Sequence, residues 1–189
     1  MAELHPDLAR ILISSKAIEN RVEELAGQIA QDYHDVLDRQ GGERLYMVGI
    51  LKGAFIFMAD LTRHLAVPHV VDFMALSSYG RTTDSGAVRI LMDLREPIEG
   101  QHVMIVEDII DTGHTLGYLY HILQGRNPAS LRTCALVRKQ RDQTGIPVDY
   151  VGFEIPDVWV VGYGLDYADR YRTLPYVAEL RREVYTKSG

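Results

Sequence analysis

The 189-residue sequence predicts an α/β fold with a mainly parallel, twisted sheet flanked by helices. Apolar residues first recur at steps of three and four from Ile18 to Val36, which is the period of an amphipathic helix. Short apolar runs then follow one another along the chain, and several are separated by segments long enough for helices. This alternation of strands and helices is typical of a parallel sheet.

The individual elements follow from these patterns. The long first helix ends before Gly41 and Gly42, and two later segments, 54–66 and 116–124, have the length of helices. The apolar runs that predict strands cover 45–50, 70–76, 88–92, 103–106, 131–137, 150–153 and 159–161. Turn residues lie at 97–100 and 127–128. Because no repeat or linker interrupts the chain, we expect residues 1–189 to form a single domain.

Composition and charge exclude several classes of protein. The formal net charge is −6, and no run of Lys or Arg is present, which argues against nucleic acid or an anionic membrane as the main partner. Cys134 is the only cysteine, and the seven histidines never have His-x-x-x-His spacing, so we expect neither a disulfide framework nor a zinc site. We recognise no signal peptide or membrane span and expect a cytoplasmic protein.

One segment combines a buried strand with residues suited to an anion. The run 103–106 leads into Glu107 and Asp108, and a loop at 111–115, Asp-Thr-Gly-His-Thr, then opens a helix. Ligands of open α/β sheets bind at the carboxyl ends of strands, where helix N-termini present free N–H groups to anions. The segment predicts a phosphate-binding loop that is neither a dinucleotide fingerprint nor a P-loop. Helix capping by Asp111 and Thr112 is the alternative, although the doubled carboxylate favours sugar hydroxyls or a cation as partners.

Residues 106–115, Val-Glu-Asp-Ile-Ile-Asp-Thr-Gly-His-Thr, resemble the phosphoribosyl pyrophosphate (PRPP) binding motif of type I phosphoribosyltransferases, in the form seen in hypoxanthine (guanine) phosphoribosyltransferases. Three more segments are similar to this family in the family's order. They are the pyrophosphate loop at 51–53, the mobile active-site loop at 78–86, and the purine-binding hood with its following stretch at 155–172. The resemblance implies a type I phosphoribosyltransferase fold, with a parallel core of about five strands at about 40–150 and a small hood from the N- and C-terminal segments.

The resemblance also implies an activity and its residues. PRPP would donate its phosphoribosyl group to N9 of hypoxanthine, giving IMP, or of guanine, giving GMP, with Mg²⁺ as cofactor and pyrophosphate as the other product. Asp111 would be the catalytic acid and base at N7 of the purine. The implied PRPP-binding residues are Lys52, Gly53, Ser78, Tyr79, Glu107, Asp108, Asp111, Thr112, Gly113, His114, Thr115 and Arg172. The implied purine-binding residues are Lys139, Trp159, Val160 and Asp166, and the implied metal ligands are Glu107, Asp108 and Asp166.

Several residues have other interpretations when they are taken one at a time. Lys52 also fits a lysine whose alkyl stem lies along a strand end, Lys139 fits a plain surface lysine, and Trp159 fits a core residue. Arg138 directly precedes Lys139, so the sequence leaves open which of the two meets O6 of the purine. In the family the peptide that corresponds to Leu51–Lys52 is often strained or cis, and the sequence leaves its geometry open.

Two other functions compete with this assignment, namely a xanthine-preferring phosphoribosyltransferase and a non-catalytic regulator that binds PRPP or nucleotides. The joint presence of Lys52, Asp111, Asp166 and Arg172 favours the enzyme. The family commonly forms dimers and tetramers, so the resemblance implies a homo-oligomer, and we assign the long first helix to packing or subunit contact. We assign packing roles to a group of tyrosines, Tyr163, Tyr167, Tyr171 and Tyr176.

Overall fold

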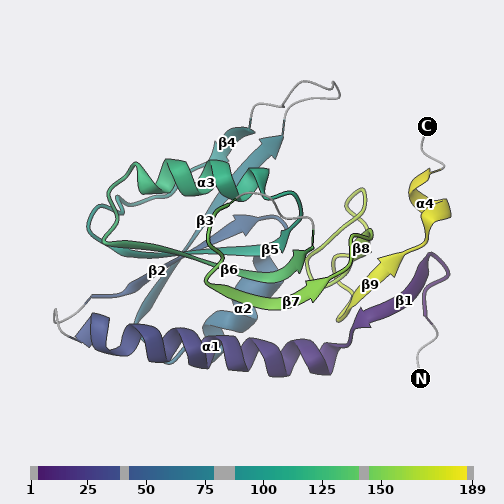
Figure 1. Ribbon diagram of the computed structural model, residues 1–189, viewed down its shortest axis with the longest axis horizontal. Helices are drawn as coiled ribbons and strands as arrows, with labels where there is room; N and C mark the ends of the chain where they lie inside the picture. Colours follow the sequence, from purple (N-terminus) through teal and green to yellow (C-terminus); the bar gives the residue numbers. More distant parts are fainter. Residues whose placement is uncertain (1–3, 39–42, 79–87, 141–144, 187–189) are drawn as a thin grey trace.

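A six-stranded sheet lies between two layers of helices in the computed structural model, which describes residues 4–38, 43–78, 88–140 and 145–186 (Figure 1). The strand order is β4-β3-β2-β5-β6-β7. All neighbours are parallel except β4, which runs antiparallel to β3 at the edge. The strands are β2 (Leu45–Leu51), β3 (His69–Ser78), β4 (Val88–Met92), β5 (His102–Ile110), β6 (Ser130–Lys139) and β7 (Tyr150–Ile155). The predicted parallel core is therefore confirmed.

The helices pack on the sheet through apolar faces, and the face of the first helix is the one that the periodicity predicts. Helices α1 (Ser15–Asp38) and α2 (Phe55–His64) cover one face, and α3 (His114–Gln124) covers the other (Figure 1). The side chain of Ser14 accepts a hydrogen bond from the Ala17 N–H at 3.2 Å and so caps α1. Each large apolar side chain buried on α1 contributes about 1.5–3 kcal/mol of transfer free energy. These side chains include Ile18, Val22, Leu25, Ile29 and Tyr33.

A second, three-stranded sheet forms the predicted hood from both ends of the chain. Its order is β1-β9-β8, with β1 (Leu8–Ile13), β9 (Val177–Leu180) and β8 (Val160–Val161) running antiparallel, and α4 (Arg182–Thr186) follows it. No local pattern in the sequence predicted β1, β9 or α4. Strand β1 pairs with β9 through two register shifts, so its buried residues do not alternate with exposed ones and no strand period is visible.

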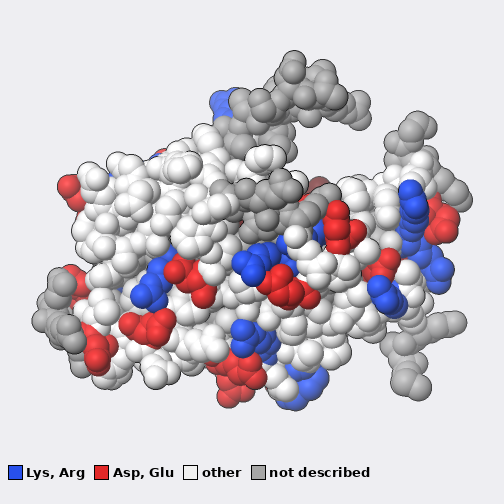
Figure 2. All heavy atoms as spheres, viewed as in Figure 1, with Lys and Arg blue, Asp and Glu red and all other residues white. Residues whose placement is uncertain are grey.

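The surface and the helices add two observations. Basic and acidic side chains are interspersed on the face shown in Figure 2, and pairs such as Lys16–Glu19 and Arg21–Glu24 lie along α1. Within the ranges that the structure describes, none of the helices has both the length and the apolar character needed to cross a membrane.

A buried carboxylate in β3 holds the connection that follows β4. Asp72 is 4% exposed and accepts hydrogen bonds from the backbone N–H groups of Phe73 (2.8 Å) and Arg95 (2.9 Å) and from the Tyr46 hydroxyl (2.9 Å). Burial by itself would raise the pKa of Asp72, but these donors hold the pKa below its ordinary value of 3.8. The folded state therefore favours the ionised form.

We expect Asp72→Asn to lower the free energy of unfolding at pH 7 by about 2–4 kcal/mol, because the amide cannot accept all three hydrogen bonds. A depressed pKa in the folded state stabilises the protein above the unfolded pKa, and this contribution disappears as the pH falls through the folded value. The difference between wild type and variant should therefore shrink below pH ~4. Urea unfolding of wild type and variant, at pH 7 and again below pH ~4, measures this difference in the free energy of unfolding.

Asp93→Asn is the matched control for this prediction. Asp93 is also an aspartate with a lowered pKa, but its main partner is Arg126 on the surface, at 2.8 Å. Exposed ion pairs contribute about 0–1 kcal/mol, so this variant should lose much less stability than Asp72→Asn. Equal losses in the two variants would show that burial of Asp72 does not decide the effect.

Candidate active site

The carboxyl ends of three neighbouring parallel strands bring the predicted site residues together. Strand β5 lies between β2 and β6, so the segments that follow these strands share one edge of the sheet. Two adjoining cavities lie there. The first, about 230 Å³, is lined by residues 107–116. The second, about 220 Å³, is lined by residues of β5, β6 and the hood, namely Asp108, Ile109, Asp111, Lys139, Trp159, Val160, Leu165 and Asp166.

The first cavity is built around the N-terminus of α3. Gly113 occupies the N-cap position with φ +78°, a left-handed conformation that suits glycine, and no side chain caps the helix. The Thr112 hydroxyl contacts Nδ1 of His114 at 3.1 Å instead. The capping interpretation of Asp111 and Thr112 is therefore wrong, and the first-turn N–H groups of α3 face a cavity suited to an anion.

Glu107 and Asp108 lie within β5 and not after it. The sequence analysis ended this strand at residue 106, but the ladder with β6 continues through Ile109 and Ile110, because backbone pairing does not depend on the side chains. Burial and the neighbouring Asp108 charge raise the pKa of Glu107 well above its usual value. Burial also raises the pKa of Asp108, to about 6. The free protein thus holds one buried and one half-buried carboxyl group whose ionisation is disfavoured, and a nearby cation would favour their charged forms.

The arrangement of carboxylates limits what kind of metal ion these residues could hold. Within the described parts of the chain, no group of three or more His, Cys, Asp or Glu side chains is placed to hold a metal ion by itself. One or two carboxylates suit Mg²⁺, which keeps several waters and uses oxygens of a bound phosphate substrate. Glu107 and Asp108 fit such an ion.

The loop after β2 lies directly against β5. A β-carbon on Gly53 would fall 1.6 Å from Oδ2 of Asp108, so no larger residue fits there without moving the carboxylate. The Leu51–Lys52 peptide is cis. The Lys52 side chain is 68% exposed, and its ammonium group contacts Oδ1 of Asp169 at 3.0 Å. Lys52 thus faces the segment 162–176 between β8 and β9, which we call the hood loop.

An ion-pair network orders the hood loop. The Arg172 guanidinium contacts Oδ1 of Asp166 at 2.7 Å and Oδ1 of Asp169 at 3.1 Å, and it donates to the Gly164 carbonyl at 2.8 Å. Because Asp169 also pairs with Lys52, it links Lys52 and Arg172, the two basic side chains that are predicted to bind PRPP. Asp169 was not among the predicted site residues, and its one signal in the sequence is its closeness to Asp166.

Lys139, and not Arg138, lines the second cavity. The Lys139 side chain is 8% exposed, and Nζ lies 3.4 Å from Oδ2 of Asp111 and 3.3 Å from Oδ1 of Asp157. Arg138 turns to Glu154, with Nε 2.9 Å from Oε1. The interpretation of Lys139 as a surface lysine is therefore wrong. Asp157 is a second residue of the site that the sequence analysis missed.

Aromatic and apolar residues close the same cavity from the hood. Trp159 is 45% exposed, which excludes a core role. Its ring stacks on Tyr185 with centroids 5.3 Å apart and meets Tyr167 edge-on at 5.5 Å. Val160, the first residue of β8, is buried beside it. A flat ligand in this cavity would meet an aromatic ring, an apolar wall and one buried cation.

Two predicted residues cannot be placed at the site. Tyr79 and the rest of the predicted mobile loop, except the backbone of Ser78, lie outside the described residues. Ser78 ends β3, and its side chain also lies outside the description. The remaining predicted residues all lie at the carboxyl edge of the sheet or on the hood that faces it.

A parallel α/β sheet whose carboxyl edge carries a helix N-terminus suited to an anion, two adjacent carboxyl groups and a hooded cavity is typical of proteins that bind a phosphorylated ligand at that edge. Residues 12–168 match the family model described as "Phosphoribosyl transferase domain". The chain therefore belongs to the phosphoribosyltransferase family, and the expected type I fold is confirmed.

Individual relatives cover nearly the whole chain. The hypoxanthine-guanine phosphoribosyltransferase of Dictyostelium discoideum is 48% identical over 182 residues, which are 94% of this chain and 98% of the relative. The hypoxanthine phosphoribosyltransferase of Salmonella typhimurium is 49% identical over 172 residues, 90% of this chain and 94% of the relative. A solved structure of a Trypanosoma cruzi hypoxanthine phosphoribosyltransferase variant with the product IMP is 44% identical. It covers 98% of this chain and 96% of that one, with a TM-score of 0.91.

Proposed function

We propose that the protein is a purine salvage enzyme that transfers the 5-phosphoribosyl group of PRPP to N9 of hypoxanthine, and also of guanine, with release of pyrophosphate. The observation that carries this proposal is that the two cavities share Asp108, Ile109 and Asp111. A phosphorylated sugar in the first cavity and a flat base in the second would therefore meet beside Asp111. The names of the relatives and the T. cruzi complexes with IMP and with substrates support the same substrates.

In this proposal, N9 of the purine attacks C1′ of PRPP as the bond to pyrophosphate breaks, and Asp111 holds or moves the proton at N7. The first-turn N–H groups of α3 and the hydroxyls of Thr112 and Thr115 bind the 5′-phosphate, with Gly113 allowing its close approach and His114 contributing its backbone. Lys139 donates to O6, which favours 6-oxopurines over adenine because adenine carries an amino group there.

The pyrophosphate end is assigned to other residues of the same edge. Lys52, Gly53 and Arg172 bind pyrophosphate from the two sides of the site, and the resemblance to the family assigns Ser78 and Tyr79 to pyrophosphate as well. Trp159 stacks on the purine, and the Val160 backbone meets the edge of the base.

Mg²⁺ is the proposed cofactor. Glu107 and Asp108 face the ribose hydroxyls directly or through one ion, and Asp166 is the proposed ligand of a second. When bound, Mg²⁺ would supply positive charge that stabilises the departing pyrophosphate. The acidic protein would then bind its polyanionic substrate through local positive groups, namely helix N–H groups, Lys52, Arg172 and the ion.

A steady-state assay with hypoxanthine, guanine, xanthine and adenine, each with PRPP and Mg²⁺, tests the proposal. We expect nucleotide product from hypoxanthine and guanine, and none from adenine. Xanthine as the preferred base would replace this assignment by the xanthine-preferring enzyme. The absence of product from all four bases, together with measurable PRPP binding, would favour the non-catalytic regulator.

We infer that the enzyme is a homo-oligomer, either a dimer or a tetramer. A structural study of the T. cruzi hypoxanthine phosphoribosyltransferase concerns the effect of its C-terminal region on oligomeric state and activity, which supports an assembly in this family. The cytoplasmic location, the single-domain organisation and the absence of nucleic-acid or membrane partners stay predictions from the sequence.

A further inference from the structure

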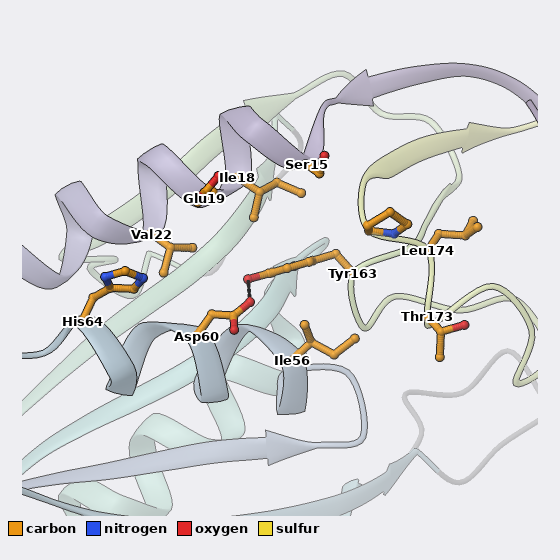
Figure 3. Close-up of a pocket in the computed structure, with 11 residues that line it drawn as sticks. Ser15, Ile18, Glu19, Val22, Ile56, Asp60, His64, Tyr163, Thr173 and Leu174 are labelled. Carbon is orange, nitrogen blue, oxygen red and sulfur yellow. Dashed lines mark hydrogen bonds between the residues drawn. The ribbon is translucent and has the colours of Figure 1, made fainter. Parts of the chain in front are cut away.

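Tyr163 links the hood loop to α2. The tyrosine is 7% exposed, and its side chain extends from the hood loop toward α2, as Figure 3 shows. Its hydroxyl donates a hydrogen bond of 2.6 Å to Oδ2 of Asp60. Both residues line a cavity of about 470 Å³ between α1, α2 and the hood loop. Two segments that are 103 residues apart in sequence are therefore joined by one partly buried hydrogen bond.

Asp60 belongs to a helix that is fixed in the core and begins at the pyrophosphate loop. Helix α2 starts at Phe55, directly after Lys52-Gly53-Ala54. Its inner face is fully buried, with Phe57, Met58 and Leu61 at most 1% exposed. Asp60 is therefore held at a constant distance from Gly53, and the outward Arg63, at 2.9 Å, occupies its other carboxylate oxygen.

The backbone around Tyr163, at the hood end of this hydrogen bond, lies directly against the loop at 51–53. Gly162, Tyr163 and Gly164 all have positive φ, at +100°, +51° and +102°. A β-carbon on Gly164 would fall 2.0 Å from the Gly53 carbonyl oxygen, so these two glycines are in backbone contact. The Gly164 carbonyl in turn accepts a hydrogen bond from the Arg172 guanidinium. Tyr163 thus directly precedes Gly164, whose carbonyl group orients Arg172 next to the pyrophosphate loop.

Tyr163 has a left-handed backbone conformation, which is uncommon for a residue other than glycine. Glycine adopts this region freely, whereas a residue with a β-carbon does so at an energetic cost. A buried ring and a hydrogen bond from its hydroxyl to a fixed carboxylate are interactions that offset this cost. Burial and the neighbouring Asp60 raise the pKa of the Tyr163 hydroxyl, which therefore stays a donor at neutral pH.

We propose that Tyr163 and Asp60 are positioning residues for pyrophosphate, because their hydrogen bond holds the Gly164 carbonyl and the Arg172 guanidinium at a fixed distance from Lys52 and Gly53. This inference rests on the proposed function, in which Lys52, Gly53 and Arg172 bind the pyrophosphate group. It extends the packing role that the sequence analysis assigned to Tyr163. It predicts an effect on the pyrophosphate end of the reaction, and no effect on the purine end.

Tyr163→Phe tests the inference, because it removes the hydroxyl and keeps the ring. We expect the KM for PRPP, and the KM for pyrophosphate in the reverse reaction from IMP, to rise by about 3- to 10-fold. The KM for hypoxanthine and kcat should change less than about twofold, since neither the purine cavity nor Asp111 is touched. Asp60→Ala should reproduce the effect, and Asp60→Asn should largely restore the wild-type constants because its amide oxygen still accepts the hydrogen bond.

Tyr150→Phe is the matched control. The Tyr150 hydroxyl donates to Oδ2 of Asp32 at the same distance, 2.6 Å. Tyr150 is the first residue of β7, so it lies at the amino ends of the parallel strands, whereas the site lies at their carboxyl ends. A purely structural role for Tyr163 predicts that both variants lose thermal stability while all kinetic constants stay at wild-type values. That result, or an equal rise in the KM values for PRPP and hypoxanthine, would overturn the inference.

Calorimetric titration with Mg²⁺ and pyrophosphate separates this inference from the proposed function. Wild-type protein that binds pyrophosphate but forms no nucleotide from any base would contradict the proposed enzyme alone. In that case a weaker pyrophosphate affinity of Tyr163→Phe, by the same factor of about 3 to 10, would still support the positioning role. Equal affinities of wild type and Tyr163→Phe would overturn it.

Discussion

Asp111→Asn is expected to lower kcat by about 10²- to 10⁴-fold while the protein still binds PRPP, because general acid–base catalysis contributes rate factors of this size. The asparagine side chain has nearly the same shape and can still accept the 3.4 Å contact from Lys139, but it cannot exchange a proton with N7 of the purine. IMP formation under saturating substrates measures kcat, and calorimetric titration measures PRPP binding.

Asp157→Asn is the matched control for this variant. Asp157 also lies beside Lys139, with Oδ1 3.3 Å from Nζ. The control therefore removes a carboxylate charge next to the same ammonium group and leaves the proposed proton acceptor, Asp111, unchanged. We expect its kcat to fall by less than about 10-fold. Unchanged turnover in Asp111→Asn, or equal losses in the two variants, would remove the assignment of Asp111 as the base.

Lys139→Gln should weaken the binding of hypoxanthine and guanine by about 10- to 100-fold, because a hydrogen bond from a charged donor contributes about 1.5–3 kcal/mol. The KM for PRPP should change far less, since Lys139 lines the cavity that faces the hood and not the phosphate loop. Steady-state constants for both substrates provide the measurement.

The neighbouring residue supplies the control for Lys139. Arg138→Gln removes a positive charge one position away, but the Arg138 side chain pairs with Glu154 outside the cavity. We expect its KM for each purine to stay within about twofold of wild type. A large loss of purine binding in Arg138→Gln, with none in Lys139→Gln, would reverse the assignment that the geometry makes.

Local patterns predicted the main sheet and its helices correctly, and tertiary pairing decided what they missed. The 3.6-residue period from Ile18 to Val36 is visible because one face of α1 packs on the sheet. Strand β1 shows no such period, because register shifts against β9 determine which of its residues are buried. The end of β5 was misplaced because two carboxylates look like the end of a strand, although the ladder with β6 continues past them.

The candidate site likewise has a part that local sequence predicts and a part that only tertiary contacts bring together. The predicted phosphate loop at 111–115 is contiguous, so its residue types and their order were enough to predict a loop that opens a helix, which the structure shows at the N-terminus of α3. Asp157 and Asp169 belong to the site through ion pairs with distant lysines, and no local pattern marks them. The choice between Lys139 and Arg138 depends on the direction in which each side chain leaves β6, because alternate residues point to opposite faces of a sheet.

The sequence by itself determined the α/β class, the parallel core and the helix that begins after the loop at 111–113, because each depends on residues that are neighbours along the chain. Only the tertiary structure decided that the hood loop lies on the loop at 51–53, with Gly164 against Gly53 and with Tyr163 hydrogen-bonded to Asp60. These contacts join segments more than 100 residues apart. Their formation depends on how the hood packs on the sheet, and a linear pattern carries no information about such distances.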